Sequence, residues 1–421
     1  MFLKTIIARN PELLKTAVSL HQDRVIPTNT WVFDLDTIRD NAKALYNAKI
    51  NNGLETYLMT KQHNRNPFIN KIAILEGLHA TVCVDQYCCH MMGRYDVKAG
   101  HVGHLNQIPS REIEYVLRLH PEVWTVYCIE QANAINHIAA KLGVKQDLLL
   151  RVYREGDLFF SGQEGGFRFD SFLDNAIEIQ KLRNVNIVGT VSFPCFKYNG
   201  KEGEVAEPSP NMTTIVDAAE LLSSKLGIEI KQINAPGNTS SITFPILKKA
   251  GATHVEPGHG LLGTTPNHRL INNLPERPTY CYVSEITHKY ESKAYAHGGG
   301  LFQDIFDPNF EYKVLVGKDP EKILKNELTW ERCSQIIDYH APLTEGGKCG
   351  VGDTAVFGFR SQLQMTRSWI AIIQDLQKGK PKLVGLFDNA CNMVDPVSLE
   401  VLPIEVAQEQ ITVVVADYAS Y

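Results

Sequence analysis

The sequence lacks paired-cysteine motifs, a basic stripe and any long apolar run. Its nine cysteines include no CxxC pair, which argues against a disulfide framework or a zinc ribbon and predicts mostly buried thiols in a reducing cytosol. The 42 Lys+Arg against 47 Asp+Glu give a net charge of −5, which argues against nucleic-acid binding. No apolar run reaches the ~20 residues of a membrane span, and the charges within residues 1–20 argue against a signal peptide. We therefore expect a cytoplasmic globular protein.

Short apolar runs alternate with segments of helical spacing through much of the chain. Continuous apolar runs, rather than alternating ones, are typical of parallel strands covered by helices. About eight βα units within residues 37–270 predict the α/β class and a closed (β/α)8 barrel, with an open doubly wound sheet as the alternative. The eight strand candidates are residues 54–60, 79–85, 101–105, 123–129, 146–153, 186–192, 229–235 and 253–256.

The remaining segments differ in character from the predicted barrel. Residues 271–421 contain prolines, turn clusters and short strand-like runs, and predict a mostly β C-terminal domain. Its strand candidates are residues 279–286, 354–359, 367–374 and 411–416. Residues 1–36 read as one or two helices followed by a strand, WVFDLD at 31–36, which we expect to pair with the C-terminal domain.

Catalytic groups of a βα barrel lie at the carboxyl ends of its strands, and three features of the sequence fall there. Lys61 follows the first strand; a desolvated amine there is a nucleophile, although most loop lysines are simply solvated. Residues 234–241 (NAPGNTSS) follow the seventh strand and suit either an anion site or a plain helix cap.

The third feature is residues 256–263 (EPGHGLLG), after the eighth strand. The run matches GxGxxG, but a turn is expected after it rather than a helix, so we reject a dinucleotide site and expect a second phosphate-holding loop. The first and eighth strands are neighbours in a closed barrel, so Glu256 should point into the mouth beside Lys61. A lysine and a carboxylate at a phosphate cradle suggest a phosphorylated cofactor.

These features together resemble the barrel family of pyridoxal 5′-phosphate (PLP) enzymes that includes alanine racemase, diaminopimelate and ornithine decarboxylases and D-serine dehydratase. Within that family the sequence looks closest to the YhfX-like branch. The resemblance covers most of the chain, barrel and β domain, and depends on the order and spacing of several strings. They are FDLDTIRDNAKAL, YLMTKQHNRNP, GHVGHLNQIP, LLLRVYREGD with GQEGGF, SFPCF, NAPGNTSS, VEPGHGLLGTTP and GDTAVFGFRSQ.

The resemblance implies roles for individual residues. Lys61 would form the Schiff base with PLP. Phe193, or less so Ser192, falls where the racemases and decarboxylases have a histidine that stacks on the PLP ring, and the aromatic Phe193 can stack there equally well. Glu256 stands where the decarboxylases have a glutamate and alanine racemase an arginine; a carboxylate there favours a protonated ring nitrogen, which stabilises a Cα carbanion. The residues that would hold the phosphate are Asn238, Thr239, Ser240, Gly258, His259 and Gly260.

A racemase needs a second acid/base on the opposite face of the substrate. The family supplies a tyrosine from the β domain of the partner subunit, and Tyr295, with His297 two residues on, lies near that position. A tyrosine packed under a glycine-rich turn is the alternative. A homodimer with sites shared across its interface follows from this resemblance.

Other polar residues have weaker claims to the site. Arg360 and Arg367 suit a substrate carboxylate, although surface ion pairing is the usual role of an arginine. His63 and His104 follow predicted strands and suit the mouth, or are hydrogen-bonded loop histidines. His340 stands near a zinc ligand of the dehydratase relatives, but FRSQ at 359–362 lacks the second ligand, a cysteine, so we expect no metal.

The sequence therefore predicts a PLP-dependent racemase or epimerase of a free amino acid. The alternatives are a PLP-dependent lyase (decarboxylase, aldolase or dehydratase) and a PLP-binding protein without turnover. A metal-dependent barrel hydrolase is disfavoured, because no carboxylate–histidine cluster is evident in the sequence.

Overall fold

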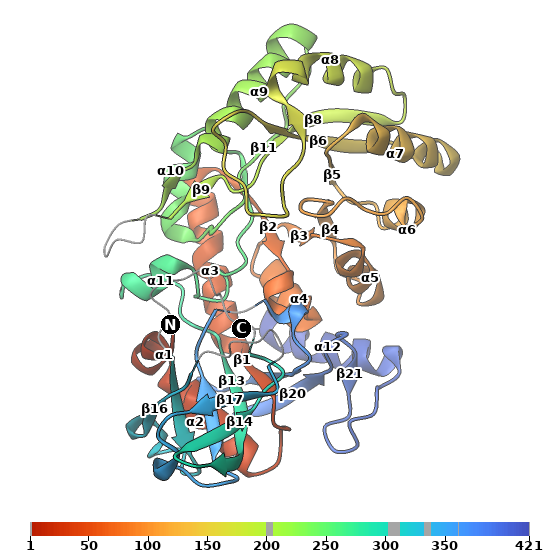
Figure 1. Ribbon diagram of the computed structural model, residues 1–421. Helices are drawn as coiled ribbons and strands as arrows, with labels where there is room; N and C mark the ends of the chain where they lie inside the picture. Colours follow the sequence, from red (N-terminus) through yellow and green to blue (C-terminus); the bar gives the residue numbers. More distant parts are fainter. Residues whose placement is uncertain (1, 199–204, 302–311, 332–337, 361, 421) are drawn as a thin grey trace. The chain divides into compact units, whose positions relative to one another are not determined.

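The computed structural model describes residues 2–198, 205–301, 312–331, 338–360 and 362–420 (Figure 1). Contacts between Cα atoms divide the chain into two compact units. The first unit consists of Met1–Asn41, Gln62–Ile72 and Leu262–Tyr421, and the second of Ala42–Lys61 and Ala73–Leu261.

The second unit contains a closed barrel of eight parallel strands. Each strand pairs in parallel with the next, and the last pairs with the first, which closes the barrel. In order around the barrel the strands are β2 (Glu55–Met59), β3 (Ala80–Cys83), β4 (Ala99–Val102), β5 (Val123–Val126), β6 (Gln146–Tyr153), β8 (Val185–Val191), β11 (Gln232–Asn234) and β12 (His254–Val255). The predicted (β/α)8 barrel is confirmed, and the open sheet is excluded.

One helix precedes the first of these strands and the others connect successive strands, as the sequence spacing predicts. They are α3 (Leu35–Asn52), α4 (Pro67–Leu75), α5 (Gln86–Arg94), α6 (Ile113–Arg118), α7 (Ile129–Leu142), α8 (Phe169–Gln180), α9 (Pro210–Leu226) and α10 (Phe244–Lys249). Short strands β7 (Phe167–Arg168), β9 (Phe196–Lys197) and β10 (Glu207–Pro208) lie in the loops that follow β6 and β8.

The first unit is built on a ten-stranded sheet. Its β1 (Thr30–Asp34) lies between β13 (Tyr280–Tyr290), to which it is antiparallel, and β19 (Trp369–Gln374), to which it is parallel. The other strands are β14 (Lys293–His297), β15 (Lys313–Gly317), β16 (Glu327–Thr329), β17 (His340–Leu343), β18 (Thr354–Phe357), β20 (Lys382–Phe387) and β21 (Met393–Val394). Helices α1 (Leu3–Arg9) and α2 (Pro11–Gln22) bury their apolar residues in one cluster with β1, β13, β18 and β19.

The prediction of a strand over residues 411–416 is wrong, because this segment lies in helix α12 (Ile404–Ala419). The run is rich in valine, which favours strands. The residues that α12 buries are Ala407, Ile411, Val414 and Tyr418, a spacing of three and four that forms one helical face. Packing of that face outweighs the local β propensity.

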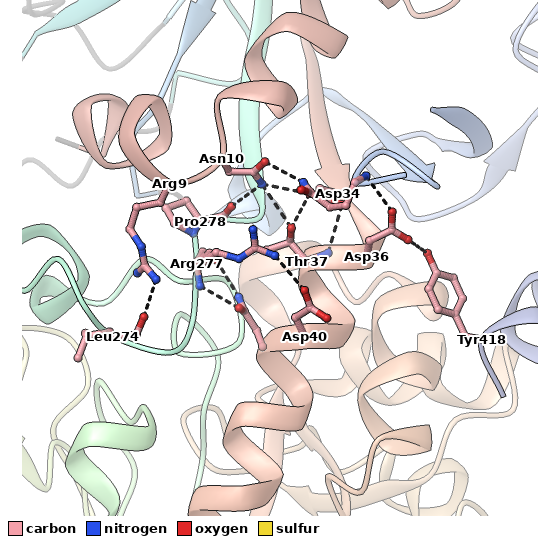
Figure 2. A network of polar contacts seen from close by, with 12 residues as sticks. Arg9, Asn10, Asp34, Asp36, Thr37, Asp40, Leu274, Arg277, Pro278 and Tyr418 are labelled. Carbon is pink, nitrogen blue, oxygen red and sulfur yellow. Dashed lines mark hydrogen bonds and ion pairs between the residues drawn. The ribbon is translucent and has the colours of Figure 1, made fainter. Parts of the chain in front are cut away.

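A buried polar network ties distant segments of the first unit together (Figure 2). The Asp34 carboxylate accepts hydrogen bonds from Thr37 Oγ1 (2.5 Å), Asn10 Nδ2 (3.0 Å) and Gln377 Nε2 (2.7 Å). Burial raises the pKa of Asp34, against the lowering effect of these donors. Tyr418 Oη donates to Asp36 Oδ1 at 2.5 Å, which holds the end of α12 against the start of α3.

Seven of the eight described cysteines are buried, as predicted, and Cys128 is exposed. Cys333 lies outside the described residues, and so does Ser361, the third residue of the FRSQ motif. Within the described ranges, every helix is too short or too polar to cross a membrane.

Candidate functional site

Lys61 and Glu256 lie at the same end of the barrel. Lys61 begins a short 3-10 turn, η1 (Lys61–His63), two residues after β2 ends at Met59. The main-chain N–H of Met59 donates to the carbonyl oxygen of Pro257 at 3.0 Å, and Pro257 is the residue that follows Glu256. Closure of the barrel through β2 and β12 therefore brings the lysine and the carboxylate to one mouth, although they are far apart in the sequence.

The Glu256 carboxylate is fully buried in a polar cluster. Its Oε1 lies 2.6 Å from His101 Nδ1 and 3.0 Å from Asn234 Nδ2. Its Oε2 has no hydrogen-bond partner among the described residues, and His104 Nε2 lies 3.6 Å away. One carboxylate oxygen is therefore occupied by two donors, and the other is left for a further group.

The electrostatics of this cluster favour a charged Glu256 carboxylate beside a neutral His104 ring. Burial raises the pKa of Glu256, but the histidines and the hydrogen bonds from His101 and Asn234 outweigh it, and the net pKa is lowered. Burial lowers the pKa of His104 to about 3, with Glu256 opposing and the positive charges of Arg151 and Lys61 adding to the effect. His104 is therefore neutral near pH 7.

His101 is the residue of this cluster that the sequence analysis missed. It is fully buried, and its Nε2 lies 2.5 Å from Thr125 Oγ1 on the neighbouring strand β5. The sequence analysis began the third strand at residue 101, whereas β4 covers Ala99–Val102. The HxxH spacing of His101 and His104 around Gly103 is the signal that could have revealed the pair. The prediction that the chain lacks a carboxylate–histidine cluster is therefore wrong.

Two loops after β11 and β12 approach each other closely. A Cβ at Gly260 would lie 2.2 Å from Thr239 O, so only glycine allows this approach. Gly237 has φ +125° and Asn238 φ 41°, both in the left-handed region. The main-chain N–H of Ser240 donates to Thr243 Oγ1, so the helix cap, one of the two alternatives for this run, is present at the start of the next helical turn.

The turn after β12 does not open a helix directly. Residues 258–263, with the buried His259 and the glycines Gly258 and Gly260, lie in turns, and the next helix is the short α11 (Pro266–Leu270). This arrangement agrees with the rejection of a dinucleotide site. Thr239 Oγ1, on the facing loop, is buried without a hydrogen-bond partner in the described part of the chain.

Phe193 is half-buried and follows β8. Its ring lies 5.8 Å from the ring of His104, edge to face, and 3.7 Å from where a Cβ of Gly237 would stand. The neighbouring Ser192 is buried, and its hydroxyl accepts a hydrogen bond from Asn211 Nδ2 at 3.1 Å. Phe193 is therefore the residue of this pair that faces the cluster.

Tyr295 and His297 lie on β14 of the first unit and point to the same, partly exposed face. The Tyr295 ring stacks on His288 with centroids 4.6 Å apart and ring planes 7° apart. His340, paired with His297 across β14 and β17, lies 5.0 Å from His288 and 6.4 Å from His297, centroid to centroid. The predicted Tyr295–His297 pair is thus part of a group of one tyrosine and three histidines, which we call the β14 histidine face.

The remaining candidates lie in the first unit. Arg367 donates to Asp338 Oδ1 at 2.8 Å. It therefore forms a surface ion pair, which was the alternative to binding a substrate carboxylate. His63 is buried and lies 2.7 Å from Asn70 Oδ1, and burial lowers its pKa to about 4; it is a hydrogen-bonded structural histidine. Arg360 is half-buried after β18.

Among the described residues, His101, His104 and Glu256 form a group whose ligand atoms all lie within 4.8 Å of one another. Two histidines and a carboxylate suit a transition metal. However, the 2.6 Å contact between His101 and Glu256 is a hydrogen bond formed by the atoms that would bind the ion. We therefore interpret the group as a hydrogen-bonded pair, His101 and Glu256, with His104 beside it.

Comparisons with known proteins agree with this architecture. Residues 33–266 match the family model for the alanine racemase N-terminal domain, and residues 281–383 match that for the YhfX-like C-terminal domain. The chain is 34% identical over 392 residues to "Uncharacterized protein YhfX" of Escherichia coli (strain K12), covering 93% of this chain and 99% of that protein. Ornithine racemase of Acetoanaerobium sticklandii is 26% identical over 211 residues, which is 50% of this chain and 55% of that protein.

A solved structure shows the same fold at low identity. D-threonine aldolase from Filomicrobium marinum aligns with a TM-score of 0.64 and 12% identity, over 87% of this chain and 95% of that one. Members of the alanine racemase fold family are PLP-dependent racemases or lyases. This chain, with its barrel and its YhfX-like C-terminal domain, belongs to the alanine racemase family.

Proposed function

We propose that this protein is a PLP-dependent racemase or epimerase of a free amino acid. The observation that supports it most is the convergence of three groups at one end of the barrel. These are the Lys61 amine, the Glu256 carboxylate with its open Oε2, and the facing loops of Thr239 and Gly260. Ornithine racemase, which matches half of this chain, adds support for the reaction type.

The residues at the barrel mouth fit PLP. A buried polar atom without a partner costs about 1–3 kcal/mol, and both Thr239 Oγ1 and Glu256 Oε2 are such atoms in the described residues. A phosphate would accept from the Thr239 hydroxyl, and a protonated ring nitrogen would donate to Glu256 Oε2. The two unpartnered atoms thus have the donor and acceptor character that the two ends of PLP require.

Each residue then has a defined task. PLP, when bound, supplies an electron sink for a carbanion at the substrate Cα. Lys61 Nζ would anchor the cofactor and move a proton on one face, the anionic Glu256 would keep the ring nitrogen protonated, and Phe193 would offer its ring for stacking. The residues that would hold the phosphate are Asn238, Thr239, Ser240, Gly258, His259 and Gly260.

The second proton donor would come from the β14 histidine face of a partner subunit. Tyr295 Oη, or the His297 ring, would move the proton on the face opposite Lys61. His104 and Arg360 are the candidates for binding the substrate carboxylate. This arrangement requires a two-fold dimer, in which each subunit gives its face to the other. We place the protein in the cytoplasm.

Cofactor attachment is tested with the purified protein and PLP. We expect a visible absorption band that borohydride abolishes, and mass spectrometry of the reduced protein should locate the pyridoxyl group on Lys61. Lys61→Ala should lack both signals, whereas Lys145→Ala, at an exposed position of the barrel unit, should retain them. Attachment to another lysine, or none in the wild type, would contradict the proposal.

The reaction is tested with L- and D-amino acids in deuterium oxide. A racemase incorporates deuterium at Cα and interconverts the enantiomers without loss of substrate. Release of carbon dioxide, an aldehyde or ammonia would instead show a lyase, the alternative that the likeness to a D-threonine aldolase supports.

The shared site is tested by complementation. Lys61→Ala is expected to be inactive and Tyr295→Phe to lower racemisation by about 10²-fold, and their mixture should regain activity, because a mixed dimer contains one site with both residues intact. A monomer in sedimentation velocity, or a mixture without regained activity although mixed dimers form, would contradict a shared site.

A further inference from the structure

His101 has no task in the proposed reaction, yet it makes a short contact with the residue that tunes the cofactor. We infer that His101 is a positioning residue: together with Asn234 it occupies Oε1 of Glu256, and so reserves Oε2 for the proton of the PLP ring nitrogen. This inference rests on the proposed function, because it presupposes that PLP binds beside Glu256.

The two oxygens of Glu256 differ in their hydrogen bonds. His101 Nδ1 at 2.6 Å and Asn234 Nδ2 at 3.0 Å both contact Oε1. The nearest histidine nitrogen to Oε2, His104 Nε2, is 3.6 Å away, too far for a hydrogen bond. The carboxylate is therefore oriented with its satisfied oxygen towards β4 and β11 and its open oxygen elsewhere.

The contacts of His101 determine which of its ring nitrogens donates. An ionised carboxylate only accepts, so Nδ1 must carry the proton that is shared with Glu256. Thr125 Oγ1, 2.5 Å from Nε2, holds the other side of the ring. With both nitrogens bonded and the ring fully buried between β5 and β12, His101 has one orientation available.

His101 and Asn234 also help to keep Glu256 charged. The charges of His104 and His101 and the hydrogen bonds from His101 and Asn234 all lower the pKa of Glu256. Because His104 is neutral near pH 7, the contributions that remain there are those of His101 and Asn234. Hydrogen bonds to a charged group are stronger than neutral ones. Without the His101 donor, a proton shared between Glu256 and the ring nitrogen moves towards the carboxylate. The titratable groups within electrostatic reach of this carboxylate or of His104 are His101, His104, Lys61, Arg151, Tyr57 and Cys195.

The experiment measures the protonation of the ring nitrogen directly. Apoprotein is loaded with PLP labelled with ¹⁵N in the ring, and the ¹⁵N resonance is followed across pH in the wild type, His101→Phe and His101→Asn. Phenylalanine keeps the ring volume without a donor, whereas the asparagine amide can replace Nδ1. In the wild type we expect a protonated nitrogen throughout the range in which the protein is folded.

We expect His101→Phe to shift the protonation equilibrium of the ring nitrogen by about tenfold or more towards the neutral form, and to weaken PLP binding by a similar factor. His101→Asn should recover most of both effects. Thr125→Val removes only the contact to His101 Nε2, and should shift the protonation equilibrium of the ring nitrogen in the same direction but by less. This variant allows the test if His101→Phe does not fold.

Several results would overturn the inference. A bound cofactor with the same ¹⁵N titration in His101→Phe and in the wild type would show that His101 has no effect on Glu256. Stoichiometric zinc in the wild type that is lost in His101→Phe would show a metal site instead. If the wild type does not bind PLP, the proposed function itself fails, whereas an unchanged titration with PLP bound overturns only the role of His101.

Discussion

Histidines gather at two places in this protein, and the two groups differ in burial. In the barrel unit, His101 and His104 are fully buried around Glu256. Burial lowers the pKa of His104 to about 3, and the 2.6 Å contact fixes His101 on the carboxylate. Charging the His104 imidazole is costly in this environment, because burial disfavours its protonated form.

The β14 histidine face belongs to the other unit and is partly exposed. Its rings contact one another by stacking and edge-to-face packing rather than through a buried carboxylate. Burial lowers the pKa of His340, and the charges of His288 and His297 add to the effect. Groups with access to solvent can exchange protons during turnover, whereas the buried cluster can only hold one in place. This difference supports the proposed division of roles, with charge control in the barrel and proton transfer in the β domain.

The largest effect should come from the buried carboxylate. Glu256→Gln should lower kcat/KM by about 10²–10³-fold, because an amide cannot retain a proton on the ring nitrogen. Glu122→Gln is the matched control: Glu122 also contacts a histidine, His79 at 2.8 Å, but precedes β5 at the opposite end of the barrel. Steady-state kinetics check both, and activity of Glu256→Gln within about tenfold of the wild type would remove the carboxylate from the mechanism.

Substitutions in the β14 histidine face should affect the two enantiomers of the substrate differently. Tyr295→Phe or His297→Gln should lower racemisation by about 10²-fold and leave PLP binding unchanged. Only one enantiomer should lose its exchange of Cα hydrogen with deuterium, because Lys61 still serves the other face. Tyr290→Phe, at an exposed position of β13, is the control. Equal loss of exchange for both enantiomers would contradict two bases on opposite faces.

Much of the fold could be predicted because several barrel strands are short, continuously buried runs, such as β3 and β5. Barrel closure then placed Lys61 and Glu256 at one mouth without any contact being known. His101 could not be identified, because the strand expected from the sequence starts at residue 101, two residues after the true start of β4. His101 then stands at one end of the expected strand, whereas in the structure it is an inward-facing residue within β4. The chemistry of its ring depends on Thr125 and Asn234, which come from other strands, and a single sequence does not reveal such pairings.

The contrast between buried and exposed polar groups can be sharpened within the first unit. Asp34→Asn should lower the free energy of unfolding by roughly 2–3 kcal/mol, because the amide NH₂ would face N–H donors of Thr37, Asn10 or Gln377 whichever way it turns. Asp40→Asn, which breaks an exposed pair with Arg277 at 2.9 Å, should cost less than about 0.5 kcal/mol. Urea unfolding measures both, and equal costs would show that burial does not set the energy of these contacts.

The smallest effect concerns the pH dependence of stability in the apoprotein. The pKa of His104 is about 3 in the folded chain against an ordinary value of 6.5, so between these values the unfolded chain binds a proton that the folded chain does not. Stability is therefore lost as pH falls from 7 towards 4.

His104→Phe lacks the imidazole that binds this proton in the unfolded chain. The loss of unfolding free energy between pH 7 and pH 5 should therefore be smaller than in the wild type by roughly 1–2 kcal/mol. His340→Gln, on the half-exposed face, should leave the slope nearly unchanged, because solvent reduces the difference between its folded and unfolded states. Urea unfolding at several pH values checks the two slopes. Parallel curves for His104→Phe and the wild type would mean that the buried ring takes up its proton in the folded state, and the barrel cluster would then resemble the β14 histidine face rather than contrast with it.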